Sequence, residues 1–256
     1  MLSRKELDGY RKITGFNLGQ VEKDYLQHIV LLLLSRSVGD ELVFKGGTCL
    51  QKVFGLNRFS EDLDFTQCGS VNFEDLSSSI ARGLRGFGYS SSLKIKKKKI
   101  AIGFNIKVQG PLYQGTERSV CSLHMEFSLR EDVLFEPEFK TLHPIYEDLP
   151  AYSTLVMNPK ELLAEKVRAL LTRNRARDLY DIYFLLKKNT ALEKDVMDKK
   201  MQYYKRTTDL NKISEAIQAR EATWEREIPQ LTPLIYDFRD VKKFILDEVK
   251  RSYESG

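Results

Sequence analysis

The hydrophobic period changes part-way along the chain, and this change limits the folds that are open to it. Apolar residues alternate with other residues in two runs, Ile100–Val108 and Cys121–Leu129. Strict alternation is typical of strands with one buried face, and Pro111 and Gly115 between the runs predict two antiparallel neighbours. From about residue 158 onward, apolar residues recur at helical spacing instead. We therefore expect an α+β fold: a core with a mixed or antiparallel sheet, followed by a C-terminal helical bundle.

The remaining elements follow from the same patterns. We expect a short strand at Glu61–Phe65, and helices over residues 21–37, 48–54, 73–86, 159–173, 177–188, 191–206, 209–227 and 236–253. The start of the helix at residue 159 is well marked, because Asn158 can cap it and Pro159 fits its first position.

Composition and charge exclude several classes of protein. The chain has 256 residues, of which 42% are hydrophobic and 30% charged, as in ordinary globular proteins. Its three cysteines, without close spacing, argue against a disulfide framework or a zinc site and fit a reducing cytoplasm. The charged N-terminus does not resemble a secretory signal, and the longest apolar run, Ile29–Leu34, is too short to span a bilayer. A net charge of +5 permits a nucleic-acid partner without requiring one.

One segment combines two glycines with two aspartates a short distance downstream. On a strand, side chains two residues apart face the same way, so Asp62 and Asp64 converge on one side. Convergent carboxylates suit Mg²⁺, which prefers oxygen ligands and shares them with substrate phosphates. Gly46 and Gly47, just before a short helix, would let backbone N–H groups approach a triphosphate.

Polar residues around these motifs extend the predicted site. Thr48 could add a hydroxyl donor, and Arg58 and Ser60 could contact phosphate oxygens. Each piece alone is weak, since Asp-x-Asp is common and Gly-Gly is usually a turn. Together they predict a magnesium–nucleoside triphosphate site.

The sequence KGGTCLQKVFGLNRFSEDLDF resembles the AbiEii/AbiGii toxin family of the DNA-polymerase-β nucleotidyltransferase superfamily. Two later segments, residues 158–166 and 177–182, resemble the third and fourth motifs of that family, in the right order. The resemblance covers about residues 40–190. It implies a polymerase-β-like nucleotidyltransferase core over residues 1–157 and a helical domain over residues 158–256 that completes the active site.

The resemblance also implies an activity and partners. A nucleoside monophosphate would pass from an NTP to an RNA acceptor, above all the 3′ end of tRNA, in a Mg²⁺-dependent reaction at a two-metal site. The chain would be the toxin of a toxin–antitoxin system in abortive infection, with a cognate antitoxin protein. Lys45 would join the nucleotide-binding residues. Glu126, on the polar face of its strand, is either the third metal-binding carboxylate or a surface glutamate.

Three residues of the helical half complete the predicted set. Lys166 lies on the apolar stripe of its helix, so it either contacts phosphate or packs its stem while its ammonium reaches water. Asp181 could hold Lys166 or an arginine in place, or could act as a base on the incoming hydroxyl. Asp178 belongs with the nucleotide-binding candidates, although an acidic residue in a first helical turn also favours the helix dipole.

Two basic groups could contact RNA phosphates. One consists of Arg168, Arg173, Arg175 and Arg177, and the other of Lys94 and Lys96–Lys99, which could equally protect a solvated strand edge. Two other functions stay open: nucleotidyl transfer to a protein or small molecule, and a non-catalytic nucleotide-binding module. The identity of the NTP is not encoded in any motif.

Overall fold

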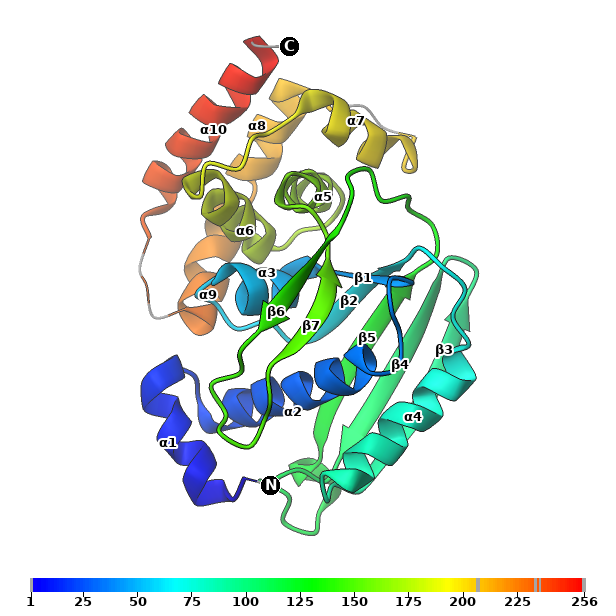
Figure 1. Cartoon of the computed structure of the whole chain (residues 1–256). Helices are drawn as coiled ribbons and strands as arrows, with labels where there is room; N and C mark the ends of the chain where they lie inside the picture. Colours follow the sequence, from blue (N-terminus) through cyan, green and yellow to red (C-terminus); the bar gives the residue numbers. More distant parts are fainter. Residues whose placement is uncertain (1, 206–207, 233, 235, 255–256) are drawn as a thin grey trace. The chain divides into compact units, whose positions relative to one another are not determined.

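The structure, a computed structural model, describes residues 2–205, 208–232, 234 and 236–254. By its contacts the chain divides into two compact units (Figure 1). Unit 1 comprises residues 1–55, 59–132 and 137–156, and unit 2 comprises residues 56–58, 133–136 and 157–256. Two short segments that precede the helices of unit 2 in the sequence, residues 56–58 and 133–136, thus pack with them.

Unit 1 is built on a seven-stranded sheet with strand order β3-β4-β5-β2-β1-β7-β6. Its elements are α1 (Arg4–Thr14), α2 (Leu18–Ser35), β1 (Leu42–Lys45), α3 (Gly46–Phe54), β2 (Asp62–Gln67), α4 (Phe73–Gly86), β3 (Ser91–Lys98), β4 (Ala101–Val108), β5 (Cys121–Ser128), β6 (Glu138–Leu142) and β7 (Tyr152–Val156). The pairs β2–β5 and β1–β7 are parallel, and the other neighbours are antiparallel. The predicted mixed sheet and the antiparallel pairing of β4 with β5 are confirmed.

An aromatic row forms the core on one face of this sheet. The rings of Phe44, Phe65 and Phe127 follow one another across β1, β2 and β5, with centroids 5.1 and 5.4 Å apart. Phe73 of α4 packs on Phe127 at 5.0 Å, and α4 lies over β3 and β4 on this side (Figure 1). Because strand side chains alternate, the residues on either side of Phe65 point to the opposite face.

A buried ion pair ties α3 to α2. Asp24 of α2 accepts hydrogen bonds from Lys52 Nζ at 2.6 Å and from Gln51 Nε2 at 2.9 Å. Tyr146 also donates to Asp24, at 2.8 Å. Burial raises the pKa of Asp24, but Lys52 and its other partners outweigh burial and hold that pKa below its ordinary value. The direction of α3 is therefore set by charge pairing at its C-terminal half.

All the regular elements of unit 2 that the structure describes are helices. They are α5 (Pro159–Thr172), α6 (Ala176–Lys187), α7 (Lys194–Gln202), α8 (Leu210–Gln218), α9 (Glu221–Leu231) and α10 (Phe238–Glu254). The predicted start of α5 is confirmed, since Asn158 Oδ1 accepts a hydrogen bond from the N–H of Lys160. Across the described residues of both units, no helix has the length and apolarity that crossing a membrane requires.

Two predicted helices differ from those observed. The single helix expected over residues 209–227 is wrong: α8 ends at Gln218 and α9 begins at Glu221. Arg220, at the break, is buried and donates to the carbonyls of Leu170 and Arg173, a tertiary contact that hydrophobic period does not reveal. The helix expected over residues 191–206 is shorter at both ends, and its last predicted residue, Arg206, lies outside the described residues.

His28 of α2 makes the stability of unit 1 depend on pH. Burial, together with the nearby Lys52 ammonium, lowers the pKa of His28 to about 3, while its Nδ1 lies 2.8 Å from the hydroxyl of Tyr152. The unfolded chain therefore binds a proton between about pH 6.5 and 3 that the folded chain does not bind, so stability falls as pH falls through this window.

Between pH 7 and pH 5, we expect the free energy of unfolding of the wild-type protein to fall by about 2 kcal/mol more than that of His28→Gln, because the variant lacks this titration. Urea unfolding of both proteins across that range measures the difference. Parallel stability–pH curves would contradict the burial of a neutral imidazole.

Candidate functional site

The turn from β1 into α3 organises the candidate residues of unit 1. Gly46 has φ +77°, a left-handed conformation that L side chains rarely adopt. A Cβ at this position would lie within 3.0 Å of Cβ and Cγ of Asp64, closer than real Cβ atoms pack. Glycine is therefore required twice, by the backbone conformation and by the close approach of the Asp64 side chain.

The N-terminus of α3 suits an anion. Lys45 is the N-cap residue and makes no side-chain capping hydrogen bond. Its ammonium instead donates to Glu131, at 3.0 Å. The first N–H groups of the helix, at Gly46 and Gly47, carry the partial positive charge of a helix N-terminus. The predicted nucleotide contact of Lys45 itself stays a prediction.

Three carboxylates share the sheet face opposite the aromatic row. Asp62 and Asp64 are two residues apart on β2, and Asp64 is in register with Glu126 on the parallel neighbour β5. All three are half-buried. Adjacent strands lie about 4.8 Å apart, so the Glu126 carboxylate is the nearest acidic neighbour of this pair on β5. Its role as a metal ligand stays a prediction.

The donor set fits magnesium only when a substrate contributes. Within the part of the chain that the structure describes, no group of three or more His, Cys, Asp or Glu side chains is gathered closely enough to hold an ion. Mg²⁺ is usually bound by one or two carboxylates, with waters and substrate phosphates completing its octahedron. Asp62 and Asp64, beside the N-terminus of α3, match this arrangement.

Thr48 and Ser60 position the start of β2, a function that the sequence does not reveal. The buried hydroxyl of Thr48 donates to the carbonyl oxygen of Asp62. The N–H of Ser60 donates to Gln51 Oε1 at 2.8 Å, and its carbonyl accepts from Gln27 Nε2 at 3.0 Å. These bonds hold the acidic strand against α3 and α2. Contacts of either hydroxyl with phosphate stay predictions.

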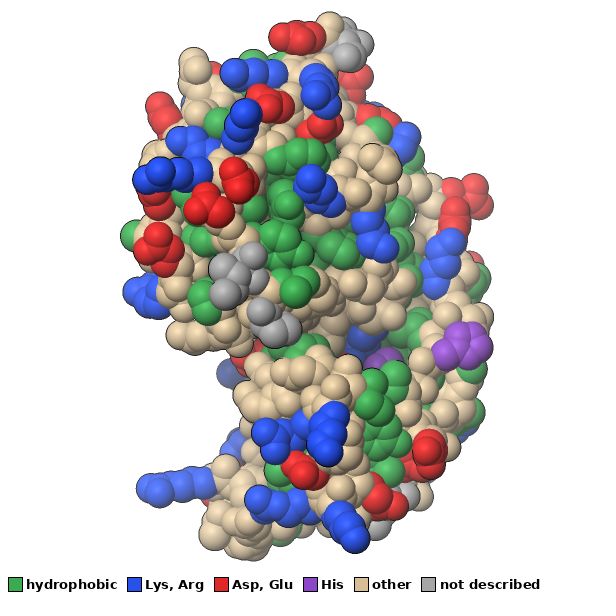
Figure 2. Space-filling view, turned by 90° about the vertical axis from the view of Figure 1, so that its left-hand side faces the viewer, with side chains coloured by type: hydrophobic (Ala, Val, Ile, Leu, Met, Phe, Trp, Pro, Cys, Tyr) green, Lys and Arg blue, Asp and Glu red, His purple; other side chains and the backbone are tan. Residues whose placement is uncertain are grey.

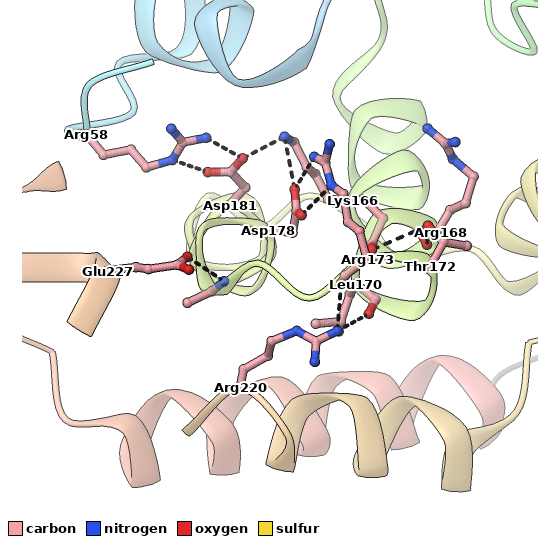
Figure 3. A network of polar contacts seen from close by, with 12 residues as sticks. Arg58, Lys166, Arg168, Leu170, Thr172, Arg173, Asp178, Asp181, Arg220 and Glu227 are labelled. Atoms are coloured by element: carbon pink, nitrogen blue, oxygen red, sulfur yellow. Dashed lines mark hydrogen bonds and ion pairs between the residues drawn. The ribbon is translucent and has the colours of Figure 1, made fainter. Parts of the chain in front are cut away.

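Asp181 is the centre of a buried charge network in unit 2 (Figure 3). Arg58 binds it with two hydrogen bonds, Nε–Oδ1 at 2.6 Å and Nη2–Oδ2 at 2.7 Å. Lys166 Nζ lies 2.7 Å from Asp181 Oδ2. The side chains of all three residues are at most 8% exposed. The ammonium of Lys166 therefore points into the protein, and of the two roles expected for Asp181 the structure contains the first: it holds Lys166 and an arginine in place.

Asp178 extends the network. It lies 3.7 Å from Lys166 Nζ, and Arg173 binds it with two hydrogen bonds of 2.7 Å each. Two further arginines of the basic group also have partners in the protein: Arg175 lies 3.9 Å from Glu227, and Arg168 donates to the hydroxyl of Tyr204. Three of the four arginines are thus engaged in contacts within unit 2.

The network disfavours Asp181 as a general base. Burial raises the pKa of its carboxyl, but Arg58 and Lys166 outweigh burial and bring that pKa below its ordinary value. In the same way, burial lowers the pKa of Arg58, but the charge of Asp181 outweighs burial and raises that pKa above its ordinary value. A carboxylate held by two cations is a weak proton acceptor. Proton abstraction by Asp181 stays a prediction that the charge balance does not favour.

Glu161 is a structural residue whose role the sequence did not indicate. It is fully buried, and its carboxylate accepts hydrogen bonds from the N–H groups of Leu134 and Phe135 at 3.0–3.2 Å. Lys200 binds the same carboxylate at 2.5 Å. Glu161 thereby fastens residues 133–136 to α5. A glutamate three residues into a helix carries no signal of so distant a partner.

The solved structures that share the fold of this chain include two nucleotidyltransferases. MenT4, a nucleotidyltransferase toxin from Mycobacterium tuberculosis H37Rv, is similar with a TM-score of 0.70 and 19% identity, over 97% of this chain and 88% of that one. A nucleotidyltransferase structure from H. pylori has a TM-score of 0.65 and 19% identity, over 94% of this chain and 97% of that one. JHP933 from Helicobacter pylori has a TM-score of 0.61 and 19% identity, over 92% of this chain and 95% of that one. At this identity the similarity establishes the fold. No curated protein matches the chain.

The family match places the chain in the class of the nucleotidyltransferases. Residues 32–244 match the family of the nucleotidyl transferase AbiEii toxin of type IV toxin–antitoxin systems, and the chain belongs to that family. The predicted family and enzyme class are confirmed. Membership implies an NTP substrate and a cognate antitoxin.

Replacement of Gly46 tests the close approach to Asp64. Gly46→Ala would combine a left-handed backbone strain of about 1 kcal/mol with displacement of the Asp64 carboxylate. Misplacing a catalytic group by about 1 Å costs about 100-fold in rate, so we expect nucleotide transfer to fall by that order. Rate assays and thermal unfolding measure the two effects separately.

Gly55→Ala is the matched control, because Gly55 also has φ +77° but a Cβ there would meet nothing within 4 Å. Gly55→Ala should lower the free energy of unfolding by a similar amount and leave the rate of nucleotide transfer unchanged. Equal activity of the two variants would contradict the argument for close approach.

Replacement of Asp181 tests its holding role. Asp181→Asn leaves Arg58 buried without its carboxylate partner and Lys166 with only Asp178, at 3.7 Å, so the free energy of unfolding should fall by about 3–5 kcal/mol. Urea unfolding measures this, with the exposed Asp195→Asn in the same unit as the control. If Asp181→Asn abolished transfer and kept full stability, Asp181 would act as a base instead.

Proposed function

We propose that this nucleotidyltransferase toxin transfers a nucleoside monophosphate from an NTP to an RNA acceptor in the cytoplasm, with the 3′ end of tRNA as its target. The observation that carries the proposal is the row of carboxylates on one sheet face, with Asp64 packed against the glycine that begins α3. The cognate antitoxin would relieve the toxicity.

The chain's own residues would bind and orient the triphosphate. Backbone N–H groups of Gly46 and Gly47, at the positive end of α3, would donate to phosphate oxygens. Asp62 and Asp64, with Glu126 beside them, would hold Mg²⁺ together with those phosphates. Magnesium, when bound, supplies a lowered pKa at the acceptor hydroxyl and charge neutralisation at the leaving pyrophosphate.

The reaction exchanges one phosphorus–oxygen bond for another. The acceptor oxygen bonds to the α-phosphorus as its hydroxyl proton passes to solvent water, and the bond from the α-phosphorus to the α–β bridging oxygen breaks to release pyrophosphate. Asp62 and Asp64, as the residues that would hold magnesium, would keep the acceptor oxygen and the leaving oxygen in line. We retain Lys166 as a phosphate-neutralising residue, with Asp181 orienting its ammonium at 2.7 Å.

A labelling experiment tests the activity and its acceptor. Purified protein is incubated with Mg²⁺, total RNA and each α-labelled NTP in turn. We expect label in RNA, and Asp62→Asn with Asp64→Asn should lower its incorporation by at least about 100-fold, as loss of a preorganised charge site does. Glu61→Gln, an exposed neighbour paired with Lys23, should stay active. Label found only in protein would contradict the RNA acceptor, and full activity of the double variant would contradict the site.

A further inference from the structure

A row of lysines lies along the edge strand of the unit 1 sheet. Lys94, Lys96 and Lys98 occupy alternate positions of β3 and are exposed, whereas Leu93 and Ile95, in the other set of positions, are half-buried. Alternate strand residues are about 6.8 Å apart and face the same way. The three ammonium groups therefore form one line on one side of the sheet, which we call the lysine row.

Strand register places the lysine row on the same face as the carboxylates. Lys96 pairs with Gly103 on β4, Gly103 with Glu126 on β5, and Glu126 with Asp64 on β2. Residues directly paired across strands point to the same face of the sheet. At about 4.8 Å per strand, the lysine row lies about 10 Å from Glu126 and about 14 Å from Asp64.

The opposite face confirms this assignment. Ile95 pairs with Phe104, whose ring packs on Phe73 of α4 at 6.1 Å. Lys97, also on that side, forms an ion pair with Glu74 of α4 at 2.5 Å. The lysines of β3 are therefore divided by face: Lys97 is neutralised by a helix, and the lysine row faces away from it.

The positive charge of the lysine row is not balanced within the described chain. No described acidic side chain pairs with Lys94, Lys96 or Lys98, and their partners on β4 are Asn105, Gly103 and Ala101. The face drawn in Figure 2, by contrast, has basic and acidic side chains interspersed, as a net charge of +5 would allow. Charge at a sheet edge prevents aggregation, but an unbalanced line of three like charges also repels itself and attracts a polyanion.

The surface between the lysine row and the carboxylates consists of a glycine, Gly103, and the polar side chains of Asn105 and His124. A Cβ at Gly103 would meet its nearest neighbour, His124 Cε1, at 3.5 Å, an ordinary contact. The packing of the protein therefore does not require glycine there, and its absence of a side chain leaves the backbone accessible. In the adjacent row, Asn105 Oδ1 and His124 Nδ1 are hydrogen-bonded at 2.9 Å, and His124 is in register with Asp62.

We propose that Lys94, Lys96 and Lys98 bind the phosphate backbone of the RNA acceptor along β3, before its 3′ end turns across Gly103 toward Glu126 and Asp64. This inference rests on the proposed function and adds the surface that holds the acceptor. An extended single strand presents phosphates at a spacing comparable to alternate strand residues, so each ammonium faces a phosphate. The contacts are to the backbone and carry no base specificity, so the 3′ sequence is read elsewhere.

The test compares two variants that each remove three exposed lysines of unit 1. One is Lys94→Gln, Lys96→Gln and Lys98→Gln; the other, the control, is Lys5→Gln, Lys12→Gln and Lys97→Gln. Binding of a fluorescent single-stranded RNA and of total tRNA is measured from 50 to 200 mM salt. Loss of three phosphate contacts should weaken RNA binding about tenfold at low salt and make the slope of log K against log salt shallower by about 2.

Kinetics distinguish an acceptor surface from general damage. The lysine-row variant should raise the apparent KM for RNA about tenfold while the kcat at saturating RNA and the KM for NTP stay unchanged. Replacing the same three lysines with arginine should restore binding. If wild-type protein labels RNA and the lysine-row variant equals the control, this inference is overturned and the proposed function stands. If wild-type protein neither binds nor labels RNA, both fall together.

Discussion

The contact between Gly46 and the Asp64 side chain is the constraint on which the rest of unit 1 depends. It brings the N-terminus of α3, the positive end of its helix dipole, beside the acidic end of β2. The Lys52–Asp24 pair then fixes the other half of α3 to α2, and Thr48 ties α3 to the carbonyl of Asp62. A triphosphate and a divalent cation need opposite charges at close range, and in the proposed site these bonds would hold that arrangement in place.

Unit 2 uses a different principle, the burial of opposite charges. Asp181 and Asp178 are both fully buried, and each is bound bidentately by an arginine, Arg58 and Arg173 respectively. Buried pairs contribute little net stability but specify one arrangement, because any other leaves a charge without a partner. Lys166 is held between the two aspartates and has its direction fixed in advance. Preorganised charge of this kind is what electrostatic catalysis requires.

Sequence patterns predicted the local features and missed the distant ones. The strands β4 and β5 and the helix α4 follow from period alone, and the common face of Asp62 and Asp64 follows from strand geometry. The short strands β6 and β7 were not predicted, because five residues with no regular alternation look like a loop. The partner of Arg58 lies 123 residues away, and no local pattern encodes such a distance. The positive φ of Gly46 was likewise not predicted, because glycine adopts positive and negative φ about equally readily.

The most direct measurement is a crystal structure of the chain with Mg²⁺ and an NTP analogue whose α–β bridging oxygen is replaced by a methylene group. We predict a metal ion about 2.1 Å from oxygens of both Asp62 and Asp64, with the triphosphate against the N–H groups of Gly46 and Gly47. A triphosphate bound away from the N-terminus of α3, or a metal ion coordinated without either aspartate, would contradict it.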